Sequence, residues 1–227
     1  NYKSRDIKVL QPEKLDSNFK FQILSFKPDF FIVAAYSKIL PKEIINIPRL
    51  GSIGAHPSLL PKYRGPTPIQ TAILNGDEST GVTLYLMDEK VDRGPIVAKS
   101  EIRISKSETY ESLHDKLAKL SGALLMEILP KFISGKLKPA PQNEAGAAYT
   151  KKFTAEDGYI KPDELEAARE SGGEQAIKLE RKIRALNPEP GVWTEKSGKR
   201  VKILQAEIIN QKLKIKTIQY EGKKPQM

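Results

Sequence analysis

Residues 30–35 read Phe30-Phe31-Ile32-Val33-Ala34-Ala35, an uninterrupted apolar run that follows Pro28-Asp29. A short run without polar residues is typical of a strand that is buried on both faces, as in a parallel sheet covered by helices. The run therefore predicts an inner strand of an α/β fold.

Shorter apolar runs and helical patterns alternate on both sides of this run. We expect further strands at residues 7–10, 51–56, 82–87 and 96–104, and helices at residues 15–26 and 67–74. Because strands that alternate with helices indicate βαβ units, the first part of the chain is predicted to form a doubly wound α/β sheet.

A long helix is predicted after Thr109, a residue type that caps helix N-termini. The apolar residues that follow recur at spacings of three and four, which places them on one helix face; they are Leu113, Leu117, Leu120, Leu124 and Ile128. His114 lies beside this stripe and is expected to be solvated and without function.

Prolines, glycines and alanines without periodicity begin at Gly135 and indicate a linker. We therefore expect three parts: a first domain over residues 1–134, a linker over residues 135–150, and a small β-rich domain over residues 151–227.

The predicted C-terminal domain contains a helix over residues 174–186 and two alternating strands over residues 200–208 and 212–220. Side chains alternate between the two faces of a strand. In the last strand the lysines therefore share one face and the apolar residues the other; they are Lys212, Lys214 and Lys216 against Leu213 and Ile215.

The composition excludes several classes of protein. The 227 residues include no cysteine and only two histidines, so we expect no disulfide and no metal site. No apolar run reaches the ~18 residues of a membrane span, and no signal peptide opens the chain. We expect a protein that is located in the cytoplasm, makes no membrane contact and is a monomer.

The net charge of +10 is concentrated near the C-terminus. Residues 196–227 hold nine Lys or Arg and two acidic residues, a net charge of +7. Such an excess indicates a polyanionic partner, nucleic acid first, and a solubilising surface is the alternative.

One segment has the composition of a site: His56-Pro57-Ser58-Leu59-Leu60-Pro61-Lys62-Tyr63-Arg64-Gly65. His56 follows a predicted strand, and ligands of doubly wound folds bind beyond the carboxyl ends of strands. Asp92 lies in a turn after the next predicted strand. An aspartate at a second strand end can meet the imidazole, fix its tautomer and raise its pKa, whereas a lone histidine is more often structural.

This segment, with Gly81-Val82-Thr83 ahead of Asp88 and Asp92, resembles the 10-formyltetrahydrofolate-dependent formyltransferases. The C-terminal motifs resemble the domain found in members that act on methionyl-tRNA. These motifs are Thr150-Lys151-Lys152-Phe153, Glu156-Asp157-Gly158-Tyr159-Ile160 and the run from Ile183 to Gly191. The resemblance implies a Rossmann-like formyltransferase domain, partial at its N-terminus, followed by a small β-rich, OB-like domain.

The resemblance also implies a reaction and a set of site residues. A formyl group would pass from 10-formyltetrahydrofolate, without a metal, to the amino group of initiator methionyl-tRNA. The catalytic positions would be His56, Asp92 and Gly54. The folate would contact Ser58, Leu59, Leu60, Pro61, Ser37, Lys38, Ile39, Leu40, Asp88, Glu89, Lys90 and Val91. We expect the tRNA at Lys212, Lys214, Lys216, Lys199 and Arg200.

The sequence departs from the family pattern in two places. Gly54 stands where the family usually has an asparagine that helps to hold the formyl oxygen. We expect a water, or else a neighbouring backbone N–H, to substitute in the space that glycine leaves. The alternative is a structural need for glycine, either a positive φ or a close approach to a neighbouring strand. Family members also begin with a further βαβ stretch, which this chain is expected to lack because Asn1 follows it.

Other functions are compatible with the same motifs. Enzymes of this fold formylate amino sugars carried on nucleotides or hydrolyse 10-formyltetrahydrofolate. A non-enzymatic alternative is an RNA-binding protein with an inactive formyltransferase core.

Overall fold

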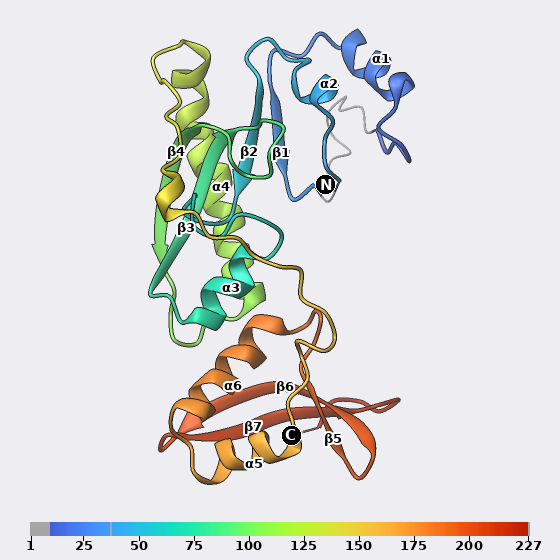
Figure 1. The fold of residues 1–227 in the computed structure, drawn as a ribbon, viewed down its shortest axis with the longest axis vertical. Helices are drawn as coiled ribbons and strands as arrows, with labels where there is room; N and C mark the ends of the chain where they lie inside the picture. The colour runs from blue at the N-terminus through green and yellow to red at the C-terminus, as the bar shows by residue number, and fades with distance from the viewer. Residues whose placement is uncertain (1–9, 37, 227) are drawn as a thin grey trace.

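The first sheet has four strands and is mixed rather than wholly parallel. The computed structural model describes residues 10–36 and 38–226. In the first part of the chain, β1 (Phe31–Ala34), β2 (Ser52–His56), β3 (Ser79–Leu86) and β4 (Ile96–Arg103) form a sheet in the order β1-β2-β3-β4. β1 and β2 are parallel, whereas β3 runs antiparallel to both β2 and β4 (Figure 1).

β1 is less buried than the apolar run predicts. Its residues alternate between half-buried and exposed, and Ile32 is 44% exposed. Within residues 10–36 and 38–226, β1 lies at the edge of the sheet and pairs only with β2. The expectation of a strand covered on both faces is therefore wrong for the described part of the chain, although the α/β class is confirmed. The predicted strand at residues 7–10 lies, apart from Leu10, outside the described residues.

The described helices of this part are α1 (Ser17–Ser25), the short α2 (Lys42–Ile45), α3 (Pro68–Asn75) and α4 (Tyr110–Ile133). Three of these four match the predicted positions to within a few residues, and α2 was not predicted. Thr109 caps α4: its side chain accepts from the Ser112 amide, and the Ser112 hydroxyl accepts from the Thr109 amide.

The predicted apolar stripe of α4 packs into the core against β3 and β4. Four of its members are buried and Leu120 is partly buried. His114 is half exposed, as predicted. No helix in the described part of the chain is both long and apolar enough to cross a membrane.

The C-terminal part is a three-stranded antiparallel sheet with two helices. Its strands are β5 (Trp193–Lys196), β6 (Lys199–Ile209) and β7 (Lys212–Tyr220), and its helices are α5 (Pro162–Glu170) and α6 (Gly173–Leu186). The sequence analysis missed α5 and β5. Asn210 and Gln211 both adopt positive φ, as a two-residue hairpin turn requires, and they join β6 to β7. A β-rich C-terminal domain is thus confirmed.

α6 connects the two parts. It packs against α3 on one side and against β6 on the other, and Figure 1 shows it between them. Ile73 of α3, Ile183 of α6 and Ile203 of β6 are almost fully buried in one continuous core. The Arg184 guanidinium also donates to the main-chain oxygen of Glu108, just before α4. The C-terminal part is therefore fixed to the first sheet by packing.

The segment 135–150 lies against the first sheet. Ala140 exchanges two main-chain hydrogen bonds with Ile96 at the start of β4. Further along, the Arg64 amide donates to Ala148, and the Thr150 amide donates to Arg64. This segment includes the single-turn 3₁₀ helix η2 (Glu144–Gly146). It therefore borders the loop that follows His56.

Candidate active site

His56 is the last residue of β2, and its side chain points into the first domain. The residue is 6% exposed and lies opposite Thr83 of β3. Its Nε2 lies 2.8 Å from the main-chain oxygen of Tyr63, within the loop that follows β2. The loop thus folds back over the histidine that precedes it.

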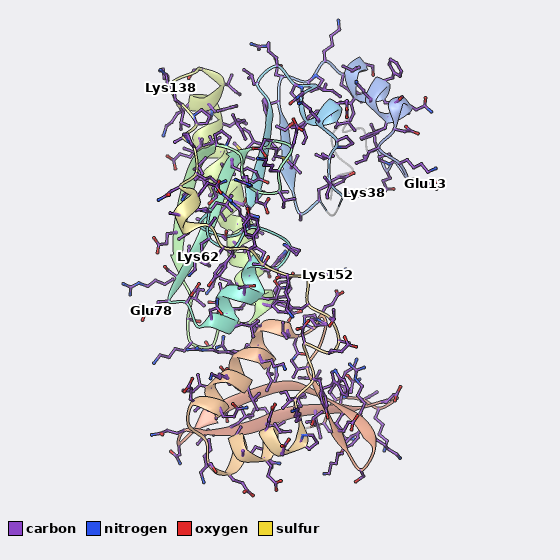
Figure 2. All side chains as sticks on the ribbon, viewed as in Figure 1. Glu13, Lys38, Lys62, Glu78, Lys138 and Lys152 are labelled. Atoms are coloured by element: carbon purple, nitrogen blue, oxygen red, sulfur yellow. The ribbon has the colours of Figure 1, made fainter. Side chains whose placement is uncertain are left out.

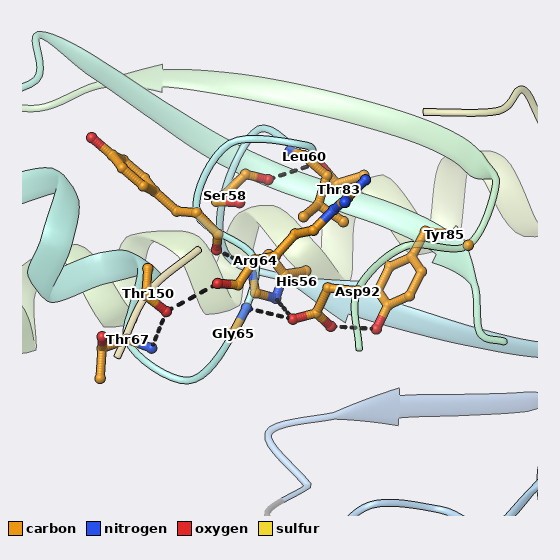
Figure 3. Close-up of polar contacts among 12 residues, drawn as sticks. His56, Ser58, Leu60, Arg64, Gly65, Thr67, Thr83, Tyr85, Asp92 and Thr150 are labelled. Atoms are coloured by element: carbon orange, nitrogen blue, oxygen red, sulfur yellow. Dashed lines mark hydrogen bonds and ion pairs between the residues drawn. The ribbon is translucent and has the colours of Figure 1, made fainter. Parts of the chain in front are cut away.

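Asp92 lies beside His56 in the loop between β3 and β4, and the structure brings the two residues together (Figure 3). Its Oδ2 is 3.6 Å from His56 Nδ1, which is longer than a hydrogen bond. The same oxygen accepts from the Gly65 amide at 2.8 Å, and Oδ1 accepts from the Tyr85 hydroxyl at 2.7 Å. The carboxylate is therefore held from two sides.

The surroundings of His56 favour a neutral ring with a defined tautomer. Burial lowers the pKa of His56, and the charge of Asp92 and the contact with the Tyr63 carbonyl only partly oppose this effect. Both ring nitrogens face oxygen atoms, and a neutral imidazole carries one N–H. Because the Tyr63 oxygen is at hydrogen-bond distance, we assign the proton to Nε2, which leaves the Nδ1 lone pair facing Asp92.

Thr83 and Lys99 shape the loop over residues 57–65. The Thr83 hydroxyl donates to the Ser58 carbonyl at 2.7 Å and accepts from the Leu60 amide at 3.0 Å. Lys99 Nζ donates to the Leu60 carbonyl. Ser58 and Leu60 are fully buried, main chain included, whereas Leu59 and Pro61 of the same loop are half-buried and are the ones a ligand could contact.

A buried arginine attaches the segment 135–150 to this loop. The Arg64 side chain is fully buried. It donates two hydrogen bonds to Gln142 Oε1, at 2.7 and 3.1 Å, two to the Glu144 carboxylate and one to the Tyr149 hydroxyl. Gln142 Nε2 in turn donates to the main-chain oxygens of Asp92 and Gly94, both at 2.9 Å. Sequence reasoning missed Gln142 because the segment shows no periodicity.

The space above Gly54 is filled by a side chain. Gly54 lies directly opposite Tyr85 in the β2–β3 register. A Cβ added to Gly54 would lie 2.5 Å from Tyr85 Cε1. The expectation that a water fills a gap at Gly54 is therefore wrong, because the Tyr85 ring occupies that position. Strand alignment is the signal that could have found Tyr85, since it lies two residues after Thr83 on the same face.

The remaining predicted folate positions lie on two exposed segments. Of the first segment, Ser37 lies outside the described residues, Lys38 and Ile39 are exposed, and Leu40 is half-buried. Lys38 Nζ donates to the main-chain oxygen of Glu13, and Figure 2 labels both residues near the edge of the first domain. The second segment, residues 88–91, is exposed throughout. An ion pair between Glu89 and Lys42 connects the second segment to the start of α2, two residues beyond the first segment.

The predicted tRNA-binding residues lie on the C-terminal sheet. Lys212, Lys214 and Lys216 are exposed, whereas Leu213 is buried and Ile215 is half-buried, as the alternation predicts. Lys216 forms an ion pair with Glu207 of β6 at 3.0 Å.

The other two predicted residues begin β6. Lys199 is exposed, and the Arg200 guanidinium stacks on the Trp193 ring, 4.3 Å from its centroid. The basic residues therefore face solvent on two parts of this sheet, and an acidic partner partly offsets the charge of Lys216.

Comparisons with known proteins agree with this combination of a mixed α/β sheet and a β-rich C-terminal part. Residues 4–129 match the family described as Formyl transferase, and residues 173–226 match the family described as Formyl transferase, C-terminal domain. The chain belongs to the formyl transferase family.

Its relatives include methionyl-tRNA formyltransferases. The chain is 41% identical over 198 residues to the methionyl-tRNA formyltransferase of Halorhodospira halophila, a match that covers 87% of this chain and 61% of that protein. The chain spans about three fifths of the length of the curated relatives it matches.

Solved structures share the fold. A methionyl-tRNA formyltransferase from Clostridium thermocellum has a TM-score of 0.66 at 20% identity, covering 88% of this chain and 81% of that one. HypX from Aquifex aeolicus in complex with tetrahydrofolic acid has a TM-score of 0.68 at 20% identity, covering 92% and 39%.

Proposed function

We propose that this protein transfers the formyl group of 10-formyltetrahydrofolate to the amino group of initiator methionyl-tRNA. The observation that carries the proposal is the 41% identity to a methionyl-tRNA formyltransferase across a segment that includes the His56–Asp92 site. The basic C-terminal sheet supports a nucleic-acid acceptor.

The folate is proposed to lie between the loop after His56 and the two exposed segments. When bound, 10-formyltetrahydrofolate supplies the formyl group. Ile39 is 80% exposed and Val91 is 52% exposed, so each segment offers an apolar side chain to an aromatic ring system. Main-chain groups of residues 88–91 provide donors and acceptors for a pterin edge, and the half-buried Leu59 and Pro61 offer apolar contacts from the loop after His56. Lys38, Leu40, Asp88, Glu89 and Lys90 complete the proposed lining.

His56 is proposed to accept a proton from the attacking amine. With Nε2–H directed to the Tyr63 carbonyl, the neutral ring presents a lone pair at Nδ1. Burial lowers the pKa of His56, so the ring is neutral and available as a base at neutral pH. Once protonated, Nδ1 becomes a donor to the formyl oxygen, on which negative charge develops, or to Asp92.

Asp92 is proposed to stabilise the protonated ring. Its Oδ2 lies 3.6 Å from Nδ1, and at this distance a carboxylate favours the imidazolium form. The proton then passes to the folate nitrogen from which the formyl group departs, so that no net proton is taken up. Hydrogen bonds from Gly65 and Tyr85 hold the carboxylate in place without neutralising its charge.

The test is a formylation assay with the full 227-residue chain. Methionyl-tRNA, an amino-sugar nucleotide and buffer alone would each be supplied with 10-formyltetrahydrofolate, and the doubly substituted variant His56→Ala/Asp92→Ala is the matched control. We expect formyl-methionyl-tRNA with the unsubstituted chain and at most a trace with the variant. Formylation of the sugar alone, hydrolysis without an acceptor, or tRNA binding without folate binding would each contradict the proposal and favour the corresponding alternative.

A further inference from the structure

Gly54 leaves room for a side chain of the neighbouring strand, because the Tyr85 ring of β3 lies directly against it. The φ angle of Gly54 lies outside the left-handed region, so its backbone conformation does not require glycine. A Cβ at this position would lie 2.5 and 2.6 Å from Cε1 and Cζ of Tyr85 and 2.9 Å from its hydroxyl oxygen. Any side chain at position 54 would therefore displace the Tyr85 ring.

The hydroxyl of Tyr85 contacts the carboxylate of Asp92, the residue beside His56. It donates to Asp92 Oδ1 at 2.7 Å, while Asp92 Oδ2 accepts from Gly65 and faces His56. Tyr85 is 6% exposed, and both burial and the charge of Asp92 raise the pKa of its hydroxyl far above the usual range. The hydroxyl thus remains protonated, and therefore a donor to Asp92, at neutral pH.

We propose that Tyr85 is a positioning residue of the formyl transfer, and that Gly54 serves the reaction by admitting the Tyr85 ring. This inference rests on the proposed function for its catalytic consequence. Two donors from different elements, β3 and the loop after β2, fix the two oxygens of one carboxylate. Rotation of the carboxylate would break both hydrogen bonds, so Oδ2 stays directed at His56.

The charged groups around Tyr85 and Asp92 determine how the loss of the Tyr85 hydroxyl changes the pKa of His56. Asp92 acts on His56, and Asp92 and Asp88 act on Tyr85. The neighbouring cation Arg64 is bound by Gln142 and Glu144, and Lys99 is bound by the Leu60 carbonyl. Loss of the Tyr85 hydroxyl leaves more of the Asp92 charge unshared, so the imidazolium form of His56 becomes more favourable.

The first test is an NMR titration of the Tyr85→Phe variant, which keeps the ring and removes the hydroxyl. The chain has two histidines, so His56 and His114 give two resolvable signals and exposed His114 is an internal reference. We expect the titration midpoint of His56 to rise by about half a pH unit or more, with His114 unmoved. Tyr220→Phe, on β7, is the matched control and should move neither. A lower thermal midpoint with an unmoved His56 would mean that Tyr85 only packs, and would overturn the proposal.

The second test measures coupling between the two strands. Gly54→Ala should lower the thermal midpoint in the presence of Tyr85 and cost much less in a Tyr85→Ala background, where the ring is gone. An equal cost in both backgrounds would overturn the role given to Gly54. If Gly54→Ala does not fold while Gly54→Ala/Tyr85→Ala does, the coupling is supported.

Kinetics separate this inference from the proposed function. Tyr85→Phe should lower kcat about tenfold with little change in KM, because the lost hydrogen bond is to a charged group that acts during the reaction. The NMR titration requires no turnover. If the protein formylates no acceptor but Tyr85→Phe still raises the titration midpoint of His56, the proposed function is contradicted and the positioning of Asp92 by Tyr85 is supported. If the midpoint of His56 does not change, the positioning role is overturned whether or not the protein is active.

Discussion

Gln142 donates a hydrogen bond of 2.9 Å to the main-chain oxygen of Asp92, across 50 residues of sequence. The amide oxygen of the same side chain accepts from the fully buried Arg64 guanidinium. One glutamine thus joins the Asp92 loop to the loop that covers His56. The segment that carries it, between the two domains in sequence, is part of the candidate active site.

Gln142→Ala should lower both stability and activity. It leaves Arg64 donors and the Asp92 carbonyl without their partner, and an unsatisfied buried polar group costs about 1–3 kcal/mol. We expect a lower thermal midpoint and a reduced kcat for formyl transfer. Gln219→Ala is the control, because its side chain donates only to an exposed surface carbonyl. Equal effects of the two substitutions would contradict a role for Gln142 in holding the Asp92 loop.

His56 and Asp92 should behave as one unit. His56→Ala alone is expected to reduce kcat by roughly 100- to 10,000-fold, the range for a lost general acid or base. Asp92→Ala should also reduce kcat strongly, and the double substitution should cost little more than His56→Ala, because each residue acts through the other. Single-turnover kinetics with excess enzyme would measure the three losses, with His114→Ala as the control. Full additivity of the two single losses would argue against the pairing.

Acid should destabilise the protein in part through His56. The ordinary pKa of histidine is 6.5, and burial lowers it in the folded state. The unfolded chain therefore binds more protons than the folded chain below about pH 6.5. The contribution of the neutral ring is fully present above that pH and is lost as the pH falls toward the folded pKa. His56→Gln should flatten the fall in thermal midpoint over this range, and His114→Gln should not; an unchanged fall in the His56 variant would contradict this assignment.

The lysines of β7 should contribute unequally to nucleic-acid binding. Lys212→Ala is expected to weaken methionyl-tRNA binding and to reduce the slope of log K against log salt by about 1. Lys216→Ala should reduce the slope less, because Glu207 already pairs with that lysine at 3.0 Å. Fluorescence titrations at several salt concentrations would measure both, with Lys131→Ala on α4 as a control of equal charge. An unchanged slope in the triple alanine variant would mean that this face is only solvated.

Periodic patterns in the sequence correctly predicted which faces of α4 and β7 are buried. The spacing of Leu113, Leu117, Leu124 and Ile128 determines one apolar face of α4, and Thr109 determines where the helix begins. Alternation along β7 likewise separates Leu213 from Lys212 and Lys214. The motif around His56, together with Asp92, identified two residues that the fold brings within 3.6 Å. In α4 and β7 the residues that determine the pattern are a few positions apart in the chain. In the site, His56 is the last residue of β2 and Asp92 lies in the loop after β3.

Contacts between distant segments were decided only by the tertiary structure. The apolar run at residues 31–34 does not say whether helices cover it, and β1 is half exposed because it lies at the edge of the described sheet. Gly54 taken alone suggested an open space, but the β2–β3 register places the Tyr85 ring there and its hydroxyl on Asp92. Gln142 shows no pattern in its own segment, because its partners lie 48 to 78 residues away. Sequence periodicity records which face of an element is buried, whereas strand register and loop packing decide which side chains meet.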